Sequence, residues 1–521
     1  MSRAAPEGAA RGSPSQPLRR ARPAAIGTKT RAPAPGGGRD SATAAAVARA
    51  MRGRDATMKT GTESARSRRR RLLGLGGAAL AGGAALVACA GPGGEAPQPG
   101  AAGATGCRTT IEVWGYGIGG DAMKKLVADY TAKHNACTIV ATDQADDASG
   151  TVQAKLTTAQ VGGAPPTLTG LSPSRFRTWS DAGLIADVDQ YFKRDRLSKE
   201  DFPPALWASM SYGGKVRALP FRANPDFVLH WIKPHFQEAG LDPNKGPQSI
   251  ADLDRMIPML HRDRNGDLER IGMQPWDFYG TGSNTLNAWA RAFGGSFYDE
   301  AKDVMTFNHP RVLRAAEWYL EWARRLDAPR ILSAANAFLT TSPTLPFFIT
   351  RKWSMHPLTP SALNLIKTAD ASLLTPDMLG AGPLPGEAPG KTGAVTIGGW
   401  GIATVAGAKE REAGWDFMRY CGADPEGTMT IALMNGLPGW LKSPGLAEVA
   451  KDPLQKPYVE AVQRAEFAQF GYYVPVGVSF APLDEAIAAK RTARDALDAM
   501  QREAEVLYED YKVRFKTQRG S

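Results

Sequence analysis

Residues 109–142, TTIEVWGYGIGGDAMKKLVADYTAKHNACTIVAT, decide the fold class of this chain. The segment contains two strand-like runs, 109–114 and 138–142, on either side of an amphipathic helix at 121–134. A strand, a helix and a second strand in this order form a βαβ unit, whose two strands run in the same direction. The segment therefore predicts an α/β fold.

Strand and helix patterns alternate through the rest of the chain, which supports the α/β prediction. Residues 391–405 predict a strand pair broken at Gly398-Gly399-Trp400, and residues 482–511 predict one long amphipathic helix. Trp318 and Trp322 lie four residues apart, so both are expected to face the core from one helix. Further helices are predicted at about 249–262, 284–293, 310–327, 332–340, 409–421 and 425–434.

The net charge of +11 comes from the N-terminal part of the chain. Residues 1–88 contain 17 Lys and Arg but 4 Asp and Glu, which leaves 46 basic and 48 acidic residues for the remainder. A folded part near neutrality lacks the basic surface that phosphate backbones require. The charge distribution therefore argues against nucleic-acid binding.

The first 88 residues have the character of an export leader. Residues 1–57 are rich in Ala, Arg, Pro and Gly, so we expect a disordered extension or a misassigned start codon. Residues 58–88 resemble a signal peptide, with four arginines at 68–71 before an uncharged, Gly-rich stretch. That stretch is too short and weakly apolar for a membrane span, which needs ~20 apolar residues. The arginines resemble a twin-arginine signal, and general secretion stays open as the alternative.

The leader ends in Leu86-Val87-Ala88-Cys89, which resembles a bacterial lipobox. In such a sequence the cysteine thiol accepts a lipid, and the small residues before it admit the signal peptidase. We therefore expect lipidation of Cys89 and a flexible tether over residues 89–106, which are rich in Gly, Pro and Ala. The alternative is an ordinary apolar cysteine at the end of a signal peptide.

Two further cysteines precede the two strands of the βαβ unit. Cys107 comes before the first strand and Cys137 directly before the second. Parallel neighbours begin side by side, within bridging distance, and export leads to an oxidising compartment. We predict a Cys107–Cys137 disulfide, with two free thiols as the alternative, and a buried apolar role for Cys421.

Residues 115–120, GYGIGG, match the pattern G-x-G-x-x-G through Gly115, Gly117 and Gly120. They follow a strand and open a helix, the context of a dinucleotide-binding loop, and Asp143 ends the next strand. The alternative function is therefore an exported dinucleotide-dependent oxidoreductase. A glycine-rich turn equally suits any ligand that approaches a strand–helix junction.

Motifs of other enzyme and metal classes are missing from the sequence. It contains no G-x-S-x-G, H-E-x-x-H or C-x-x-C, and its six histidines show no metal-ligand spacing. Residues 263–269, DRNGDLE, resemble the start of a calcium loop but lack its glycine at position six and glutamate at position twelve. We expect a polar surface turn there, and the sequence leaves a Ca²⁺ ion near Asp263 and Asp267 open.

A series of motifs, in their order along the chain, resembles the family 1 extracellular solute-binding proteins, the receptors of ABC importers. The resemblance covers about 107–515. Thr167 departs from the family, which usually has Asp after the turn at 162–166. The landmarks are the first strand and helix at 110–134, the turn at 162–166, and the stretches 212–221, 236–241, 293–296, 351–355 and 398–417.

The resemblance implies two α/β lobes that close on a ligand held in a cleft between them. Hinge strands are expected to cross between the lobes near 220–224 and 392–397. Lobe one would comprise 107–222 and 394–440, and lobe two would comprise 223–393 and 441–521. Ligand groups in such sheets bind beyond the carboxyl ends of strands, at topological switch points.

Aromatic residues at predicted strand ends, with polar neighbours, are the candidates for ligand contact. An aromatic face can cover the C–H face of a sugar ring, and packing within a lobe is the alternative for each residue. Trp400 leads, because Gly398 and Gly399 permit a sharp turn with positive φ that would present it to the cleft. The candidates are Trp114, Tyr116, Asp146, Asp147, Ser172, Asn224, Trp276, Asp277, Tyr279, Trp400, Trp440 and Tyr473.

The resemblance implies a lipid-anchored substrate-binding subunit of an ABC importer on the outer face of the bacterial cytoplasmic membrane. The expected ligand is a mono- or oligosaccharide or another small polar solute, and the expected partners are ABC permease subunits. No enzymatic activity, cofactor or metal is expected, and the chain should be monomeric.

The lipobox generates a direct prediction. Changing Cys89 to Ser should leave the protein without lipid and release it from the membrane, because no other thiol lies at the cleavage site. Membrane fractionation and intact-mass spectrometry check this result. A variant that stays in the membrane fraction at the wild-type mass would contradict lipidation at Cys89.

Overall fold

The structure is a computed structural model, and all the residues that it describes lie within the unit Gly94–Ser521. They are residues 109–115, 118, 120–134, 137–144, 151–212, 214–225, 227–264, 266–275, 283–299, 301–331, 350–387, 396–434, 436–464, 467–468 and 478–516.

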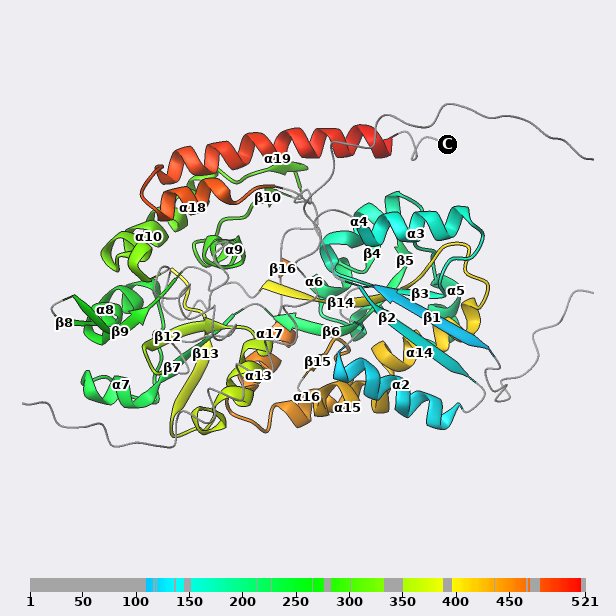
Figure 1. Ribbon diagram of the computed structural model, residues 1–521, viewed down its shortest axis with the longest axis horizontal. Helices are drawn as coiled ribbons and strands as arrows, with labels where there is room; N and C mark the ends of the chain where they lie inside the picture. Colours follow the sequence, from blue (N-terminus) through cyan, green and yellow to red (C-terminus); the bar gives the residue numbers. More distant parts are fainter. Residues whose placement is uncertain are drawn as a thin grey trace, which may run out of the picture. The chain divides into compact units, whose positions relative to one another are not determined.

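A seven-stranded sheet, with strands drawn from residues 110–468, organises one of two halves of the folded part of the protein (Figure 1). Its strand order is β15-β6-β14-β3-β1-β2, and β16 pairs with β14. β1 is parallel to β2 and β3, which confirms the predicted βαβ unit, whereas β14 is antiparallel to both β3 and β6. The strands are β1 (Thr110–Gly115), β2 (Thr138–Asp143), β3 (Leu168–Leu171), β6 (Ala218–Pro225), β14 (Thr396–Thr404), β15 (Leu437–Pro438) and β16 (Phe467–Ala468).

A five-stranded sheet with the order β13-β7-β12-β9-β8 organises the other half. Two short hairpins, β4–β5 and β10–β11, complete the strands of the described residues. The strands of the five-stranded sheet are β7 (Val228–Ile232), β8 (Arg262–Arg264), β9 (Asp267–Met273), β12 (Trp353–Leu358) and β13 (Leu379–Pro383). The hairpin strands are β4 (Ser211–Tyr212), β5 (Lys215–Val216), β10 (Tyr298–Asp299) and β11 (Val304–Met305).

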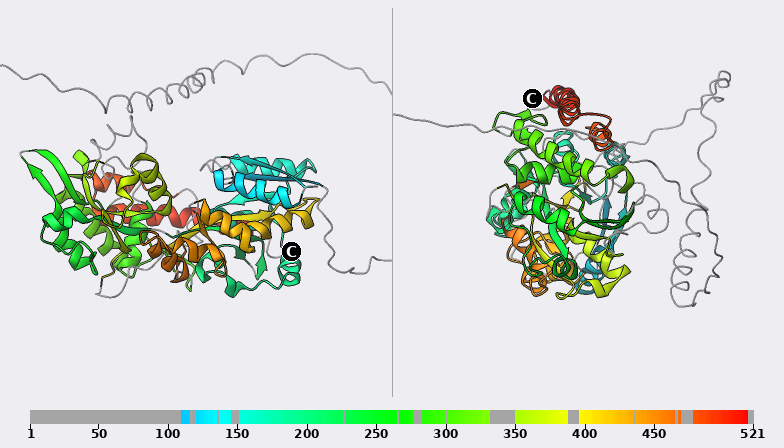
Figure 2. Two further views of the ribbon diagram at one scale, coloured as in Figure 1. Left: turned by 90° about the horizontal axis from the view of Figure 1, so that it is seen from below. Right: turned by 90° about the vertical axis from the view of Figure 1, so that its left-hand side faces the viewer.

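Helices surround both sheets, so the predicted α/β class is confirmed (Figure 2). Two single 3₁₀ turns, η2 (Lys199–Asp201) and η3 (Ala371–Leu373), accompany them. The helices are α2 (Asp121–Lys133), α3 (Thr151–Val161), α4 (Pro173–Asp181), α5 (Asp189–Arg194), α6 (Pro204–Ala208), α7 (Lys233–Glu238), α8 (Ile250–Leu260), α9 (Ser283–Ala292), α10 (Pro310–Arg325), α13 (Pro360–Ala369), α14 (Arg411–Ala423), α15 (Pro425–Leu433), α16 (Pro444–Val449), α17 (Lys456–Arg464), α18 (Ala481–Ile487) and α19 (Ala493–Lys516).

The chain passes directly from one sheet to the other between β6 and β7. β6 ends at Pro225 in the seven-stranded sheet, and β7 begins at Val228 in the five-stranded sheet. Only residues 226–227 separate them, and Phe227 adopts a positive φ of 40°. The second predicted crossing, near 392–397, falls partly outside the described residues.

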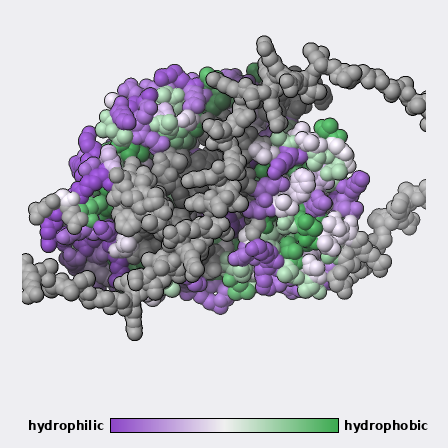
Figure 3. Space-filling model, viewed as in Figure 1, coloured by the Kyte–Doolittle hydropathy of each residue, from purple (hydrophilic) through white to green (hydrophobic). Residues whose placement is uncertain are grey.

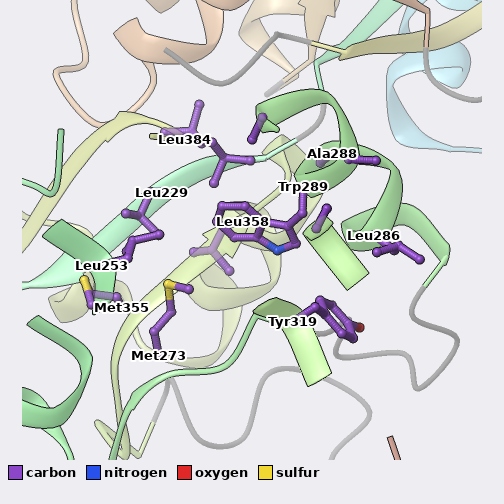
Figure 4. Packing of buried hydrophobic residues seen from close by; sticks show 14 of the residues in the cluster. Leu229, Leu253, Met273, Leu286, Ala288, Trp289, Tyr319, Met355, Leu358 and Leu384 are labelled. Atoms are coloured by element: carbon purple, nitrogen blue, oxygen red, sulfur yellow. The ribbon is translucent and has the colours of Figure 1, made fainter. Parts of the chain in front are cut away.

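Trp289 on α9 is a centre of the core beside the five-stranded sheet (Figure 4). Its side chain is fully buried among residues of β7, β9, β12 and α10, and its indole N–H donates to the Pro275 carbonyl oxygen at 2.9 Å. The indole therefore combines a large apolar contact area with a satisfied donor. The labelled neighbours in Figure 4 are Leu229, Leu253, Met273, Leu286, Ala288, Tyr319, Met355, Leu358 and Leu384.

Trp318 and Trp322 face this core, as their spacing predicts. Both indole N–H groups donate to one carboxylate oxygen of Asp254 on α8, at 2.8 and 2.9 Å. The shared acceptor fixes α10 against α8.

On the outside of the protein, hydrophilic residues predominate among the described surface in the view of Figure 3.

The expected turn at Gly398-Gly399-Trp400 is wrong. These residues lie inside one continuous strand, β14, and the glycines with positive φ among the described residues do not include either of them. A Cβ on Gly399 would collide with the Arg222 carbonyl oxygen of β6. Glycine is therefore needed here for close strand packing rather than for a turn.

The single C-terminal helix expected over 482–511 is also wrong, because α18 and α19 are separate. α18 ends where Ala489 adopts a positive φ of 58°. Thr492 then caps α19, since its hydroxyl accepts the Asp495 backbone N–H at 3.1 Å. The Thr-x-x-Asp spacing is a helix-start signal that the amphipathic pattern obscured.

Of the four cysteines, Cys137 and Cys421 lie among the described residues. Cys137 is disulfide-bonded, Cys421 is a buried free thiol, and Cys89 and Cys107 lie outside the described residues. The pairing of Cys107 with Cys137 stays a prediction. Asp263 and Asp267 lie on the β8–β9 hairpin, and Asp263 forms an ion pair with Arg330 at 2.6 Å.

Neither a metal centre nor a membrane span occurs among the residues that the structure describes. They contain no cluster of three His, Cys, Asp or Glu suited to a metal ion. None of their helices has the length and apolarity needed to cross a membrane.

Two buried histidines lie opposite each other in the five-stranded sheet. His230 on β7 pairs with His356 on β12, and His356 stacks on Trp353 with ring centroids 4.3 Å apart. Burial lowers the pKa of His230 to about 4 and that of His356 to about 3. Both rings are therefore neutral at the pH of most environments.

Gly115 generates a stability prediction. Its φ is +130°, and a Cβ would collide with the Gly170 backbone of β3. Gly115→Ala should lower the free energy of unfolding by about 2–5 kcal/mol, through strain and overlap. Chemical denaturation measures the change. Gly120→Ala is the matched control, because a Cβ there has no neighbour within 4 Å; an equal loss in both variants would contradict the packing explanation.

The histidine pair predicts loss of stability in acid. Both pKa values are lower in the folded than in the unfolded state, so the unfolded chain takes up the protons first as the pH falls. Stability should be complete above about pH 6.5 and decline between pH 6.5 and pH 4, by about 1.4 kcal/mol per pH unit for each histidine. Melting curves across this range check it. His356→Phe should weaken the dependence, and an unchanged slope would contradict the prediction.

Candidate functional site

The seven-stranded sheet has a topological switch point between β1 and β3. The chain leaves β1 through α2 to reach β2 on one side, and returns through α3 to β3 on the other side. Gly115 at the end of β1 pairs with Gly170 near the end of β3. Open α/β sheets bind ligands just beyond such carboxyl ends. This edge of the sheet is therefore the candidate site.

Trp400 lies at the same edge, on the antiparallel strand next to β3. Gly401 pairs with Leu171, the last residue of β3, so Trp400 is level with Ser172. The pairing of β14 with β6 is irregular between Trp400 and Gly401. Such bulges re-aim side chains near binding sites. Trp400 is half-buried and packs against the core cluster that contains Trp415.

Arg222 is a site residue that the sequence did not reveal. It pairs with Trp400 in the β6–β14 register, and its guanidinium carbon lies 5.8 Å from the centroid of the Trp400 ring. A guanidinium over an indole face is favourable and limits the orientations of the ring. The motif stretch 212–221 ends directly before Arg222 and does not mark it, because only the strand register brings Arg222 opposite Trp400.

The other described candidates occupy different positions around this edge. Ser172 is buried before α4, and Asn224 is half-buried on β6 opposite Gly398. Trp114 packs on a different core cluster, around Trp179, on the opposite face of the sheet from the cluster that Trp400 contacts. The two tryptophans therefore do not form one aromatic wall.

Among the predicted aromatic contacts that the structure describes, Trp440 is the most buried. It is 8% exposed and belongs to the core cluster of Trp415, and its indole N–H has no hydrogen-bond partner. The predicted residues that lie outside the described part of the chain are Tyr116, Asp146, Asp147, Trp276, Asp277, Tyr279 and Tyr473.

A hollow with a volume of about 520 Å³ lies elsewhere on the same half of the protein, among α2, α14 and α15. Its charges are largely paired, because Lys133 forms an ion pair with Glu426 and Arg419 lies 3.5 Å from Asp424. Burial and the nearby Glu412 raise the pKa of Asp416, which also lines it. The hollow lies where α2 ends and β2 is about to begin, at the amino ends of the strands. It is thus away from the switch point.

The structure gives the G-x-G-x-x-G pattern a packing explanation at its first position. Gly115 is required by the close approach of β1 to Gly170. A dinucleotide-binding sheet is mostly parallel around its switch point, whereas here β14 runs antiparallel beside β3. Gly117 lies outside the described residues. The packing of β1 against β3 therefore explains the glycine at position 115 without a bound pyrophosphate.

Known proteins share this architecture. The maltotriose-binding protein of Pyrococcus abyssi is 22% identical over 296 residues, which are 55% of this chain and 57% of that protein. CpMnBP1 with mannobiose bound has a TM-score of 0.63 and 24% identity, covering 76% of this chain and 100% of that one. The cyclic alpha-maltosyl-1,6-maltose binding protein of Arthrobacter globiformis has a TM-score of 0.59 and 21% identity, covering 77% and 99%.

These structural neighbours establish the fold as the two-lobed α/β architecture of solute-binding proteins. The chain spans little more than half the length of the curated relative that it matches. The family model for bacterial extracellular solute-binding proteins matches residues 114–427, which is more than half of the chain. The chain therefore belongs to the bacterial extracellular solute-binding protein family.

Proposed function

We propose that this protein is the substrate-binding subunit of an ABC importer and that it binds a mono- or oligosaccharide between its two lobes. The observation that carries the proposal is the position of Trp400, half-buried at the carboxyl end of β3 and next to the switch point. The named relatives bind maltotriose, mannobiose and a cyclic maltosyl-maltose, which supports a carbohydrate ligand.

The chemistry of the edge suits a sugar ring. An indole supplies an apolar face for the ring's C–H groups, and Arg222 against the indole limits its rotation. Asn224 and Ser172 carry donors and acceptors suited to hydroxyl groups. Of the predicted contacts, we retain Trp400, Ser172 and Asn224 as the central ones.

The proposed place of action is the outer face of the cytoplasmic membrane. The lipobox at Cys89 would anchor the chain through a lipid, and residues 89–106 would give it reach. Two lobes, 107–222 with 394–440 and 223–393 with 441–521, would close on the sugar and present it to the permease subunits. A monomer that performs no chemistry of its own suffices for this role.

Trp400→Ala tests the binding site. Loss of the stacked face should weaken binding of the true ligand tenfold to more than a hundredfold, since burying such a face is worth about 1.5–3 kcal/mol. Maltotriose and mannobiose are the first probes for calorimetric titration. Because Trp400 is only half-buried, its loss should lower the melting temperature of the unliganded protein modestly.

Trp415→Phe is the matched control, because Trp415 is fully buried in the same core and bonds to Asp195 at 2.7 Å. It should lower the melting temperature and leave the affinity unchanged. Wild-type affinity in Trp400→Ala would overturn the assignment of Trp400. If a broad sugar and polyol panel bound nowhere and the purified protein showed nicotinamide or flavin absorbance, the oxidoreductase alternative would replace the importer function.

A further inference from the structure

The C-terminal helix α19 is anchored in the half of the protein that contains the five-stranded sheet. Leu497, Met500, Ala504 and Tyr508 lie on its buried face and belong to the same core as Trp289. The helix also contacts α10, α18 and β11 of that half. Core packing therefore holds α19 against this half of the protein as far as Tyr508.

One turn further, α19 reaches the other half of the protein. The Tyr511 hydroxyl donates a hydrogen bond to the carboxylate of Asp181, at the end of α4. α4 directly follows β3 of the seven-stranded sheet. Figure 1 shows α19 running from α18 toward α4. The contact thus joins two elements that belong to different sheets.

Arg177, one turn before Asp181 on α4, completes the contact. Its guanidinium lies 5.5 Å from the centroid of the Tyr511 ring and 4.0 Å from the Asp181 carboxylate. The side chains of Arg177 and Asp181 are only 14% and 8% exposed. Polar groups that are buried to this degree depend on their partners, since water cannot replace a lost hydrogen bond.

The α19 side of the contact is braced by Asp303, in the β10–β11 hairpin. Its carboxylate accepts hydrogen bonds from Tyr298 and Tyr508, and the rings of Tyr508 and Tyr511 stack with centroids 6.1 Å apart. Burial alone would raise the pKa of Asp303, but the two hydroxyls and the charges of Arg177 and Lys512 keep it below its usual value. Tyr511 therefore stacks on Tyr508, whose hydroxyl is fixed by the Asp303 carboxylate.

We propose that Tyr511, Asp181 and Arg177 form a latch between the two halves, and that this latch holds the two halves at one angle. Any rotation that moves α4 away from α19 separates the Tyr511 hydroxyl from a buried carboxylate. A hydrogen bond to a charged group is strong enough to change the ratio of two conformations by on the order of tenfold. None of the three latch residues is a candidate contact of the proposed carbohydrate, so the latch is argued independently of the ligand.

Spin-label distance measurements on the unliganded protein test the latch. Labels at Lys155→Cys on α3 and Lys245→Cys after α7 occupy exposed positions in the two halves. Tyr511→Phe removes one hydroxyl and keeps the ring. It should shift or broaden the inter-label distance distribution, with the minor arrangement gaining population on the order of tenfold.

Tyr458→Phe is the matched control, because its hydroxyl donates at 2.6 Å to the Leu358 carbonyl oxygen, within the five-stranded half. It should lower the melting temperature and leave the distance distribution as in the wild type. A Tyr511→Phe distribution that overlays the wild type, or the same change in both variants, would overturn the latch. Either result leaves the sugar-binding proposal untouched, because no ligand is present.

Discussion

The antiparallel pairing of β6 with β14 is the constraint on which the rest of the structure depends. It continues from Ile397–Pro225 to Ala403–Ala218 and brings together segments that are far apart in the sequence. Two residues after β6 the chain enters β7, so an internal strand of the seven-stranded sheet leads directly to the five-stranded sheet. Backbone packing at Gly399 keeps the two strands close.

The same pairing determines the candidate site. A register shifted by one residue would move Arg222 away from Trp400 and turn the indole to the other face of the sheet. Because β3 ends here and the β6–β14 register shifts between Trp400 and Gly401, the indole lies at the edge of the sheet and stays only half-buried. The site is therefore a property of three strands together, and no single segment of the chain contains it.

How far the sequence could predict the protein depends on whether a feature is local. The βαβ unit, the core positions of Trp318 and Trp322 and the polar hairpin at Asp263 follow from periodicity and turn chemistry within short segments. Arg222 could not be predicted, because its partner is 178 positions away and strand register is a tertiary property. The role of the glycines in β14 could not be predicted for a similar reason. The sequence alone does not distinguish a glycine required by close strand packing from one required by a turn.

Position 400 is set apart from its neighbours by what surrounds the backbone. At Gly399 any side chain meets the Arg222 carbonyl oxygen, and at Gly401 it meets the Met210 sulfur. The side chain of residue 400 instead reaches partly into solvent. The strand thus offers one changeable position within a rigid frame. In the proposed function, position 400 is therefore the place in β14 where another side chain would change the ligand preference while the backbone packing of the sheet stayed the same.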